Sequence, residues 1–271
     1  MLKIKLFQIF YSDKTQHEND VGFLGLDNIE NLRPDWREYW PIRNFLLTNS
    51  LDTDTYYSFF SPKFKEKTNL SSIEVHNFIS KNKESFDIFI FSPYFDQGAF
   101  FLNVFEQGTI SHSGIMPIFQ DCVKLIFPSI DLNTLVMDSR NITFCNFIVA
   151  KPAFWLVWLE VCEKIYSIAE SGQTKLSISL NANINYSISS APVKVFVIER
   201  IASLLLCTQS NWKVKSYDST TLPLSNVSIN QFPSDLIMLD ALKIASSTQG
   251  YPAYLNEFSK LRQSIISKLK K

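Results

Sequence analysis

Short apolar runs alternate with amphipathic stretches along this chain, which is the pattern of an α/β protein. The apolar runs predict strands over residues 4–11, 56–60, 87–91, 132–136 and 142–149. Apolar positions at helical spacing predict helices over residues 36–47, 72–82, 98–107, 115–127, 152–169, 192–207, 233–247 and 253–269. Residues 14–34 are predicted as a loop, and residues 171–190 as a loop or a short β segment. We therefore expect a sheet flanked by helices, with a pair of helices closing the chain.

The composition narrows the class of protein. Hydrophobic residues make up 46% and charged residues 19% of the chain, which favours a folded core over disorder. The 26 Lys and Arg balance the 26 Asp and Glu, so there is no basic field that would favour nucleic acid. The four cysteines form no CxxC pair, which indicates reduced thiols and a cytoplasmic protein. Neither a signal peptide nor a membrane span of about 18 apolar residues is predicted.

A stretch dense in acids, amides, arginines and tryptophans separates the first two predicted strands. In open α/β sheets ligands bind at the carboxyl ends of strands, so we interpret this stretch as the mouth of a sugar or nucleotide-sugar site. Arginine forks suit phosphate or carboxylate groups, while tryptophan suits the face of a sugar or base. A salt-bridged helix cap is the alternative interpretation. The candidate binding residues are Tyr11 at the end of the first strand, and Asp27, Asn28, Asn31, Arg33, Asp35, Trp36 and Arg43.

Other polar positions lie near the remaining predicted strands and helices. The strand at 56–60 ends in a polar elbow that begins at Ser61, and the strand at 87–91 ends in a similar Phe-Ser-Pro sequence. A polar cluster follows at Glu106, Gln107 and His112, and Asn146 and Lys151 bracket the end of the strand at 142–149. Glu199 and Arg200 interrupt the apolar stripe of the helix at 192–207, as a buried pair near the site or as an exposed pair.

In the order of these features the chain resembles bacterial glycosyltransferase-like proteins from capsule and O-antigen clusters. The resemblance covers residues 4–206 and includes the acid-and-asparagine opening, the Trp/Tyr-rich helix and the elbow at 57–63. The clusters at 104–112, 145–151 and 195–200 complete it. It implies a GT-A-like fold related to the Rossmann fold, with a mixed sheet flanked by helices. It also implies a nucleotide-sugar-binding domain at 1–206 and a C-terminal helical extension at 207–271.

The elbow departs from the pattern of related groups, because it reads Ser-Pro-Lys where they carry His-Tyr-Arg-Arg. GT-A enzymes commonly hold Mg²⁺ or Mn²⁺ with an Asp-x-Asp motif at a strand end, but here Asp52 and Asp54 precede the strand. We therefore predict a site without a metal or other cofactor, in which Lys63, Lys67 or Arg43 neutralises the diphosphate. Mg²⁺ or Mn²⁺ is the alternative.

The function implied is transfer of a sugar from a nucleotide-sugar donor to a glycan or lipid-linked glycan acceptor of a surface polysaccharide. If transfer inverts configuration, a base must deprotonate the acceptor; Asp96 or Glu106 is predicted for this role, with His112 as the rival. The alternative function is a non-catalytic glycan- or nucleotide-binding subunit of a polysaccharide assembly system. Peripheral attachment to the inner membrane is the alternative to a fully cytoplasmic location.

Several other enzyme classes lack their sequence signatures here. The chain has no P-loop, which disfavours kinase or ATPase chemistry. It has no GxGxxG after the first strand, which disfavours a Rossmann dehydrogenase, and no GxSxG elbow, which disfavours a serine hydrolase.

Overall fold

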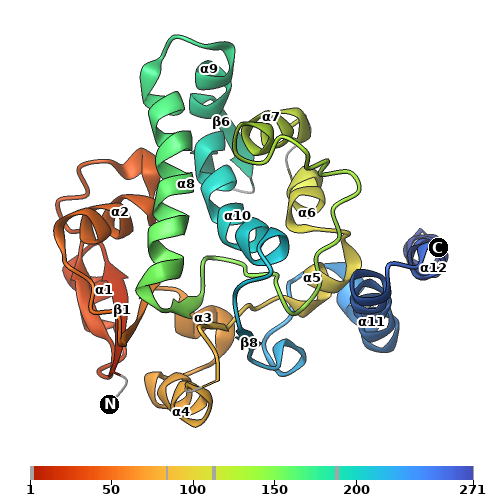
Figure 1. Cartoon of the computed structure of the whole chain (residues 1–271), viewed down its shortest axis with the longest axis horizontal. Coiled ribbons are helices and arrows are strands. Elements are labelled where there is room, and N and C mark those ends of the chain that lie inside the picture. Colours follow the sequence, from red (N-terminus) through yellow and green to blue (C-terminus); the bar gives the residue numbers. More distant parts are fainter. Residues whose placement is uncertain (1–2, 84, 112–113, 187–188, 271) are drawn as a thin grey trace.

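The computed structural model describes residues 3–83, 85–111, 114–186 and 189–270 (Figure 1). The first half of the chain contains β1 (Lys3–Phe10), α1 (Asp13–His17), β2 (Leu24–Asp27), η1 (Pro34–Trp36), α2 (Tyr39–Thr48), β3 (Thr55–Phe60), α3 (Phe64–Thr68), α4 (Ser72–Asn82), β4 (Ile88–Ile90), α5 (Phe95–Phe100), α6 (Val104–Ser111) and α7 (Met116–Ile126). The second half contains β5 (Ile148–Ala150), α8 (Pro152–Ser171), α9 (Lys175–Asn181), β6 (Asn183–Tyr186), β7 (Ser189–Pro192), α10 (Val193–Thr208), β8 (Val214–Ser216), η2 (Ser219–Thr221), η3 (Ser228–Gln231), α11 (Pro233–Gln249) and α12 (Pro252–Leu269).

The centre of the fold is a six-stranded mixed sheet with the strand order β2-β1-β3-β5-β4-β8. β1 pairs in parallel with β2 and β3, and β4 pairs in parallel with β8. β5 lies between β3 and β4 and is antiparallel to both. The carboxyl ends of the other five strands therefore meet at one edge of the sheet, together with the start of β5. The predicted α/β class, with a mixed sheet flanked by helices, is confirmed.

Helices cover both faces of this sheet, because its strands alternate side chains between two apolar cores. All six residues of β3 are buried. Tyr57 and Phe59 contribute to the core under α2, α8 and α10, whereas Tyr56 and Phe60 contribute to the core against α3 and α4. α8 and α10 lie side by side in the centre of Figure 1. The sheet edge that carries the strand ends is therefore framed by helices from both layers.

The C-terminal part of the chain differs from the predicted helical extension. β8 pairs with β4, so the boundary drawn at residue 206 separates an edge strand from its own sheet. Only α11 and α12 resemble the predicted extension. They pack against α5 through a third core that includes Leu236, Leu239 and Phe258, and in Figure 1 they lie at the end of the molecule that carries the C-terminus.

Two predicted strands are shortened or absent. Residues 132–134 form a turn and residues 135–136 are irregular, and within 142–149 only the end of the segment pairs, as part of β5. The side chain of Asn103 donates hydrogen bonds to the carbonyls of Leu132 (2.8 Å) and Leu135 (2.7 Å). These bonds bind the segment to the start of α6 instead of to a strand. The segment 14–34, predicted as a loop, contains β2. In the segment 171–190 the β6–β7 hairpin, which ends at residue 192, agrees with the predicted β alternative, whereas the helix α9 was not predicted.

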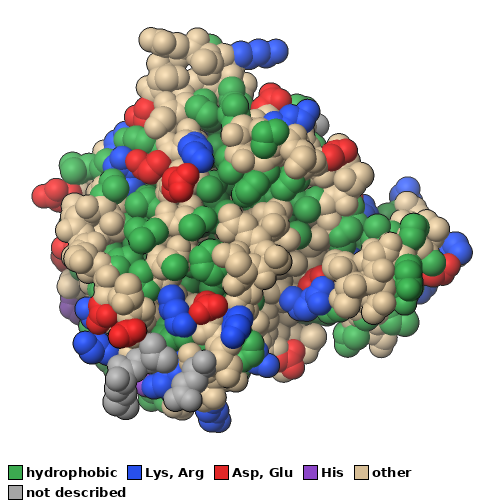
Figure 2. Space-filling model, viewed as in Figure 1, with side chains coloured by type: hydrophobic (Ala, Val, Ile, Leu, Met, Phe, Trp, Pro, Cys, Tyr) green, Lys and Arg blue, Asp and Glu red, His purple; other side chains and the backbone are tan. Residues whose placement is uncertain are grey.

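The surface matches the balanced composition. On the face shown in Figure 2, basic and acidic side chains are interspersed among hydrophobic ones. Among the residues that the structure describes, none of the helices combines the length and the apolar character needed to cross a bilayer.

Candidate functional site

A cleft lies along the sheet edge where β1, β3 and β4 end and β5 begins. It consists of three adjoining pockets with volumes of about 350, 40 and 350 Å³. The first pocket is lined by Tyr11, Asn31, Pro34, Arg37 and Glu38. The second shares Arg37 and Glu38 with the first and adds Ser61, Lys67, Asn146 and Glu199. The third shares Glu199 and Cys145 with the second and adds Tyr94, Gln97, Gln107, Thr143 and Arg200.

Unusual backbone conformations concentrate in this cleft. Among the described residues, six non-glycine residues have a positive φ, and five of them line the pockets: Asn31, Arg37, Tyr94, Cys145 and Asn146. Arg37 has φ 49° and ψ −133°, a combination that side-chain-bearing residues rarely adopt. The sixth residue, Asn69, ends helix α3. Such strained positions cost about 1–3 kcal/mol each and cluster at functional sites, which supports a functional role for the cleft.

Lys67 places a cation in the second pocket, close enough to Glu199 for the two charges to interact. Its Nζ donates a hydrogen bond to Cys145 Sγ at 3.0 Å, and within the described ranges it forms no salt bridge. Burial lowers the pKa of Lys67, but the neighbouring Cys145, Tyr94 and Glu199 outweigh this and raise it. Burial raises the pKa of Cys145 to about 11, so at neutral pH the pair is an ammonium and a thiol. The ammonium is therefore available to an anionic ligand.

Arg37 supplies a second cation at the junction of the first and second pockets. Its Nη2 donates to the carbonyl of Ser190 at 3.1 Å, and it forms no salt bridge in the part of the chain that the structure describes. The positive φ of Arg37 also explains why α2 begins only at Tyr39, and not at the predicted position 36. The chain turns at this residue instead of continuing from η1 into the helix.

Glu199 of α10 lies between the second and third pockets. Burial raises the pKa of its carboxyl, and Glu38 raises it further, while Arg200, Lys67 and Arg37 oppose this without outweighing it. Its carboxylate has no hydrogen bond or salt bridge to any other described residue. A half-buried acid with a raised pKa and no partner is a candidate for proton transfer.

Three buried polar atoms in the cleft also lack hydrogen-bond partners. They are the Tyr11 hydroxyl in the first pocket, Asn146 Oδ1 in the second and Thr143 Oγ1 in the third. Buried polar groups are normally paired, so an unpaired one in a pocket indicates a missing ligand or water. Each pocket therefore has at least one polar atom available for a ligand.

The structure brings part of the predicted site together in this cleft. The predicted residues that line it are Tyr11, Asn31, Trp36, Ser61, Lys67, Gln107, Asn146, Glu199 and Arg200. Glu199 and Arg200, for which an exposed pair was the alternative, are half-buried and buried respectively. Asp27 ends β2 and Asn28 begins the turn that follows it, beside Asn31 of the first pocket. Asp27 accepts the Ile29 N–H at 2.8 Å, and Asn28 donates to Asn31 at 3.3 Å.

The other predicted arginines hold helices together outside the cleft. Arg33 donates to Asp35 and Glu170, and Lys194 donates to Asp35 at 2.5 Å. Burial raises the pKa of the Asp35 carboxyl, but Arg33 and Lys194 outweigh this and hold it at about 2. The salt-bridged cap, the alternative interpretation of this stretch, therefore describes Arg33 and Asp35.

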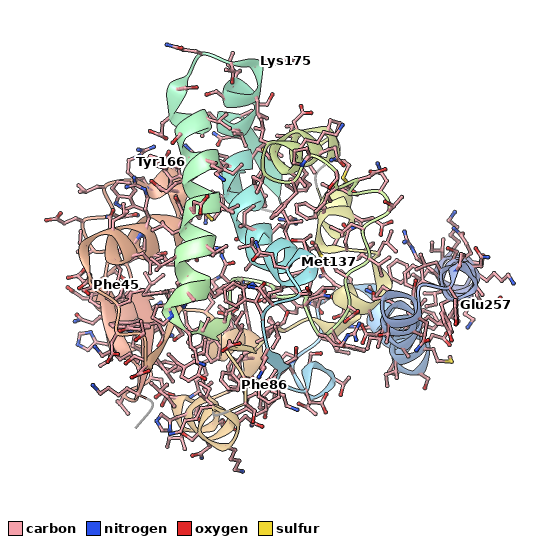
Figure 3. All side chains as sticks on the ribbon, in the orientation of Figure 1. Phe45, Phe86, Met137, Tyr166, Lys175 and Glu257 are labelled. Atoms are coloured by element: carbon pink, nitrogen blue, oxygen red, sulfur yellow. The ribbon has the colours of Figure 1, made fainter. Side chains whose placement is uncertain are left out.

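Arg43 has the same kind of structural partner. It donates to Glu163 of α8 at 2.6 and 2.8 Å, and its guanidinium lies 4.3 Å from the ring of Tyr166, which is labelled on α8 in Figure 3. Arg43 is therefore paired with an acid and is not among the residues that line the three pockets.

The predicted bases are also placed elsewhere. Asp96 is fully buried and accepts hydrogen bonds from the backbone N–H and hydroxyl of Ser225. Glu106 accepts the Leu102 N–H at 2.6 Å and pairs with Arg262 of α12. Both carboxylates hold the C-terminal part of the chain and neither lines the cleft. His112 lies outside the described residues.

The remaining lysines do not reach the cleft either. Lys63 is exposed before α3, and Lys151 pairs with Asp87 at 2.9 Å at the opposite edge of the sheet. Asp52 and Asp54 also lie at that opposite edge, where Asp52 accepts the Asp54 N–H at 3.0 Å. Over the described ranges, no three His, Cys, Asp or Glu residues are grouped so that they could hold a metal ion.

The candidate residues chosen from the sequence do not include Glu38, Tyr94 or Cys145, and Arg37 is noted only as one of the charges that crowd the dense polar stretch. Arg37 and Glu38 lie in the dense polar stretch, so their residue types are a usable signal. The positive φ of Arg37, Tyr94 and Cys145 leaves no such signal, because this conformation is normally adopted by glycine or asparagine. Comparisons with protein-family models, curated proteins and solved structures give no match to this chain.

Proposed function

We propose that this chain is a glycosyltransferase with a GT-A-like fold. It moves a sugar from a nucleotide-sugar donor to a glycan or lipid-linked glycan acceptor of a surface polysaccharide. The observation that carries the proposal is that one cleft holds two cations and a carboxylate, Arg37, Lys67 and Glu199, none of which forms a salt bridge among the described residues. This cleft lies at the carboxyl ends of strands, where open α/β sheets bind their ligands.

In this proposal Arg37 and Lys67 hold the donor diphosphate. The guanidinium offers a planar fork to phosphate oxygens, and the ammonium offers a compact charge. Both favour departure of the nucleoside diphosphate, because negative charge grows on it as the bond to the sugar breaks. Lys67 was one of the three cations predicted for this role, whereas Lys63 and Arg43 are placed outside the cleft. These two cations support a reaction without a metal ion, and EDTA tests that part of the proposal.

The first pocket is proposed to hold the nucleoside. It adjoins Arg37 and measures about 350 Å³, within the range of small-molecule sites. The carboxylate of Glu38 accepts hydrogen bonds from ribose hydroxyls, as acidic residues do in other nucleotide-binding α/β proteins. The unpaired hydroxyl of Tyr11 and the amide of Asn31 supply further polar contacts.

Glu199 is proposed as the base that takes the proton of the acceptor hydroxyl. Its raised pKa makes the carboxylate a better proton acceptor than an ordinary glutamate. Its position between the second and third pockets places it between donor and acceptor. This role replaces the one predicted for Asp96 or Glu106.

Thermal-shift titration with uridine, cytidine, guanosine and thymidine diphosphate sugars, with and without EDTA, tests the donor site. Binding raises the melting temperature with ligand excess, and we expect the shift to survive EDTA. Lys67→Met and Arg37→Ala should each weaken donor binding at least tenfold, because each removes a charged contact to the diphosphate. Lys63→Met, an exposed lysine outside the cleft, is the matched control.

Two results would contradict the proposal. If none of these donors changes the melting temperature, the proposed donor site is contradicted. If EDTA abolishes the change in melting temperature, the metal-independent form of the proposal is contradicted. Donor binding without transfer to candidate glycan acceptors would favour the non-catalytic nucleotide-binding subunit instead.

A further inference from the structure

Arg200 is a buried cation that forms no salt bridge with any carboxylate among the described residues. Only 8% of the residue is exposed, and its donors reach the carbonyls of Val104 (2.9 Å) and Phe196 (2.7 Å) and the side chain of Gln107 (3.2 Å). Burial lowers the pKa of Arg200 to about 10, partly opposed by Glu199, so the guanidinium is still charged at neutral pH. A guanidinium carries more N–H donors than these three acceptors use.

The wall of the third pocket is shaped around this guanidinium. Gly108 leaves room for it, because a Cβ there would lie 2.5 Å from Arg200 Nη2. The ring of Phe119 lies 4.9 Å from the guanidinium carbon. Gln107 contacts both Arg200 and Gln97, so a polar wall continues from the charge along the pocket.

A second observation in the same pocket points to a ligand. The hydroxyl of Thr143 has no hydrogen-bond partner, although Thr143 is only 1% exposed. Its backbone is fixed independently, because its N–H donates to Ser203 and its carbonyl accepts from Ser203. A buried charge without a salt bridge and an unpaired buried hydroxyl are both better satisfied when a polar ligand contacts them.

We propose that the third pocket is the acceptor subsite and that it takes a sugar carrying an anionic group, either a carboxylate or a phosphate, against Arg200 and Thr143. The role as acceptor subsite rests on the glycosyl transfer proposed above. The amides of Gln97 and Gln107 fit sugar hydroxyls, and the rings of Tyr94 and Phe144 fit the apolar face of the sugar. The volume of about 350 Å³ accommodates a small ligand, and Glu199 at its boundary faces the acceptor hydroxyl.

Ligand-observed NMR titration of the full chain tests this subsite without any nucleotide. The probes are methyl glucuronide, glucose 6-phosphate, the neutral methyl glucoside and inorganic phosphate. We expect an anionic sugar to bind at least tenfold more tightly than the neutral glucoside, and the better of the two anionic sugars identifies the group. Equal affinity for the neutral and both anionic sugars would overturn the proposal, as would binding of inorganic phosphate alone.

Two variants connect the binding to the pocket. Arg200→Lys keeps the charge and loses the planar fork, and Thr143→Val removes the hydroxyl at nearly constant volume. Each should reduce the preference for the anionic sugar about tenfold while the donor-induced thermal shift stays unchanged, which also reports that the protein is folded. An undiminished preference in both variants would contradict the assignment.

The two proposals fail in different experiments. If no donor binds but the anionic sugar still binds and its binding depends on Arg200, the glycosyl transfer and the role of the pocket as acceptor subsite are contradicted. If donors bind but the protein does not prefer the anionic sugar, only the proposed anionic-sugar subsite is contradicted.

Discussion

The raised pKa of Glu199 lowers the stability of the folded protein at neutral pH. Its carboxylate is half-buried on α10 and unpaired among the described residues, so folding places a charge in an unfavourable environment. Because its folded-state pKa is raised, the folded protein binds a proton more tightly than the unfolded chain does. The free energy of unfolding therefore falls as pH rises from about 4.5 through the folded-state pKa. At neutral pH the protein is less stable than it would be with a neutral group at this position.

Glu199→Gln should therefore stabilise the protein at neutral pH and abolish sugar transfer. We expect the free energy of unfolding to rise by about 0.5–2 kcal/mol, the usual size of a single stabilising substitution. The melting temperature should rise by a few degrees. Thermal unfolding at pH 5 and pH 7 measures it, and the gain should be larger at pH 7. Glu257→Gln, in an exposed pair, is the control. An unstable variant at pH 7 would show that Glu199 is a structural residue.

At the scale of elements, the contact between α2 and α8 is held by polar groups as well as by the core. Glu163 on α8 accepts hydrogen bonds from Arg43 and from the hydroxyl of Tyr39 on α2. Burial raises the pKa of Glu163, but these two donors outweigh it and lower it. A lowered pKa contributes stability above pH 4.5 that is lost as pH falls through the folded-state value.

Glu163→Gln should destabilise the protein by about 1–3 kcal/mol at neutral pH, because it weakens charge-assisted hydrogen bonds that are partly buried. Urea unfolding measures the change, and the difference from the wild type should shrink below pH 4.5. Glu160→Gln, in an exposed pair with Lys164 on the same helix, should have almost no effect. Donor binding should be unchanged in both variants. If donor binding were lost in Glu163→Gln but not in Glu160→Gln, Arg43 would have to be assigned to the donor site.

Local signals explain which elements were predictable from the sequence. α4 has a capping box between Ser71 and Glu74, and proline begins both α8 and α11, so these helices lie where predicted. The segment at 132–136 was not predictable as a turn and irregular chain, because its partner is the distant Asn103. Lys67 could be chosen as a candidate binding residue because it is a cation near the end of a strand. Arg43 is also a cation, but it pairs with Glu163, which lies too far along the chain for the sequence to indicate the contact.

At the scale of the whole molecule, the terminal helices are attached to the rest of the fold by buried polar groups. Lys243 of α11 is fully buried and donates to the carbonyls of Gly98 (2.5 Å) and Phe101 (2.8 Å). Asp240 on the same helix accepts from Ser139. Burial lowers the pKa of Lys243 to about 8, against the opposing effect of Asp240. The unfolded chain, with an ordinary lysine pKa near 10.5, therefore binds more protons between these two values.

The contribution of Lys243 to stability should consequently rise with pH between about 8 and 10.5. Comparison with Lys243→Met isolates this effect from other groups that titrate in the same range. The difference in unfolding free energy should shift in favour of the wild type by up to about 1.4 kcal/mol per pH unit. Denaturant titrations at pH 7, 8, 9 and 10 measure it. A difference that is constant over this range would mean that Lys243 keeps an ordinary pKa.

The placement of β5 between β3 and β4 has a consequence for synthesis on the ribosome. β3 is made well before β5, and until β5 emerges one edge of this fully buried, largely aromatic strand has no partner. Exposed apolar strand edges promote association with other chains. The nascent protein must therefore protect this edge while the intervening helices are made, and the sheet becomes continuous only after residue 150. β8 then adds the last edge strand, so the central sheet is completed late in translation.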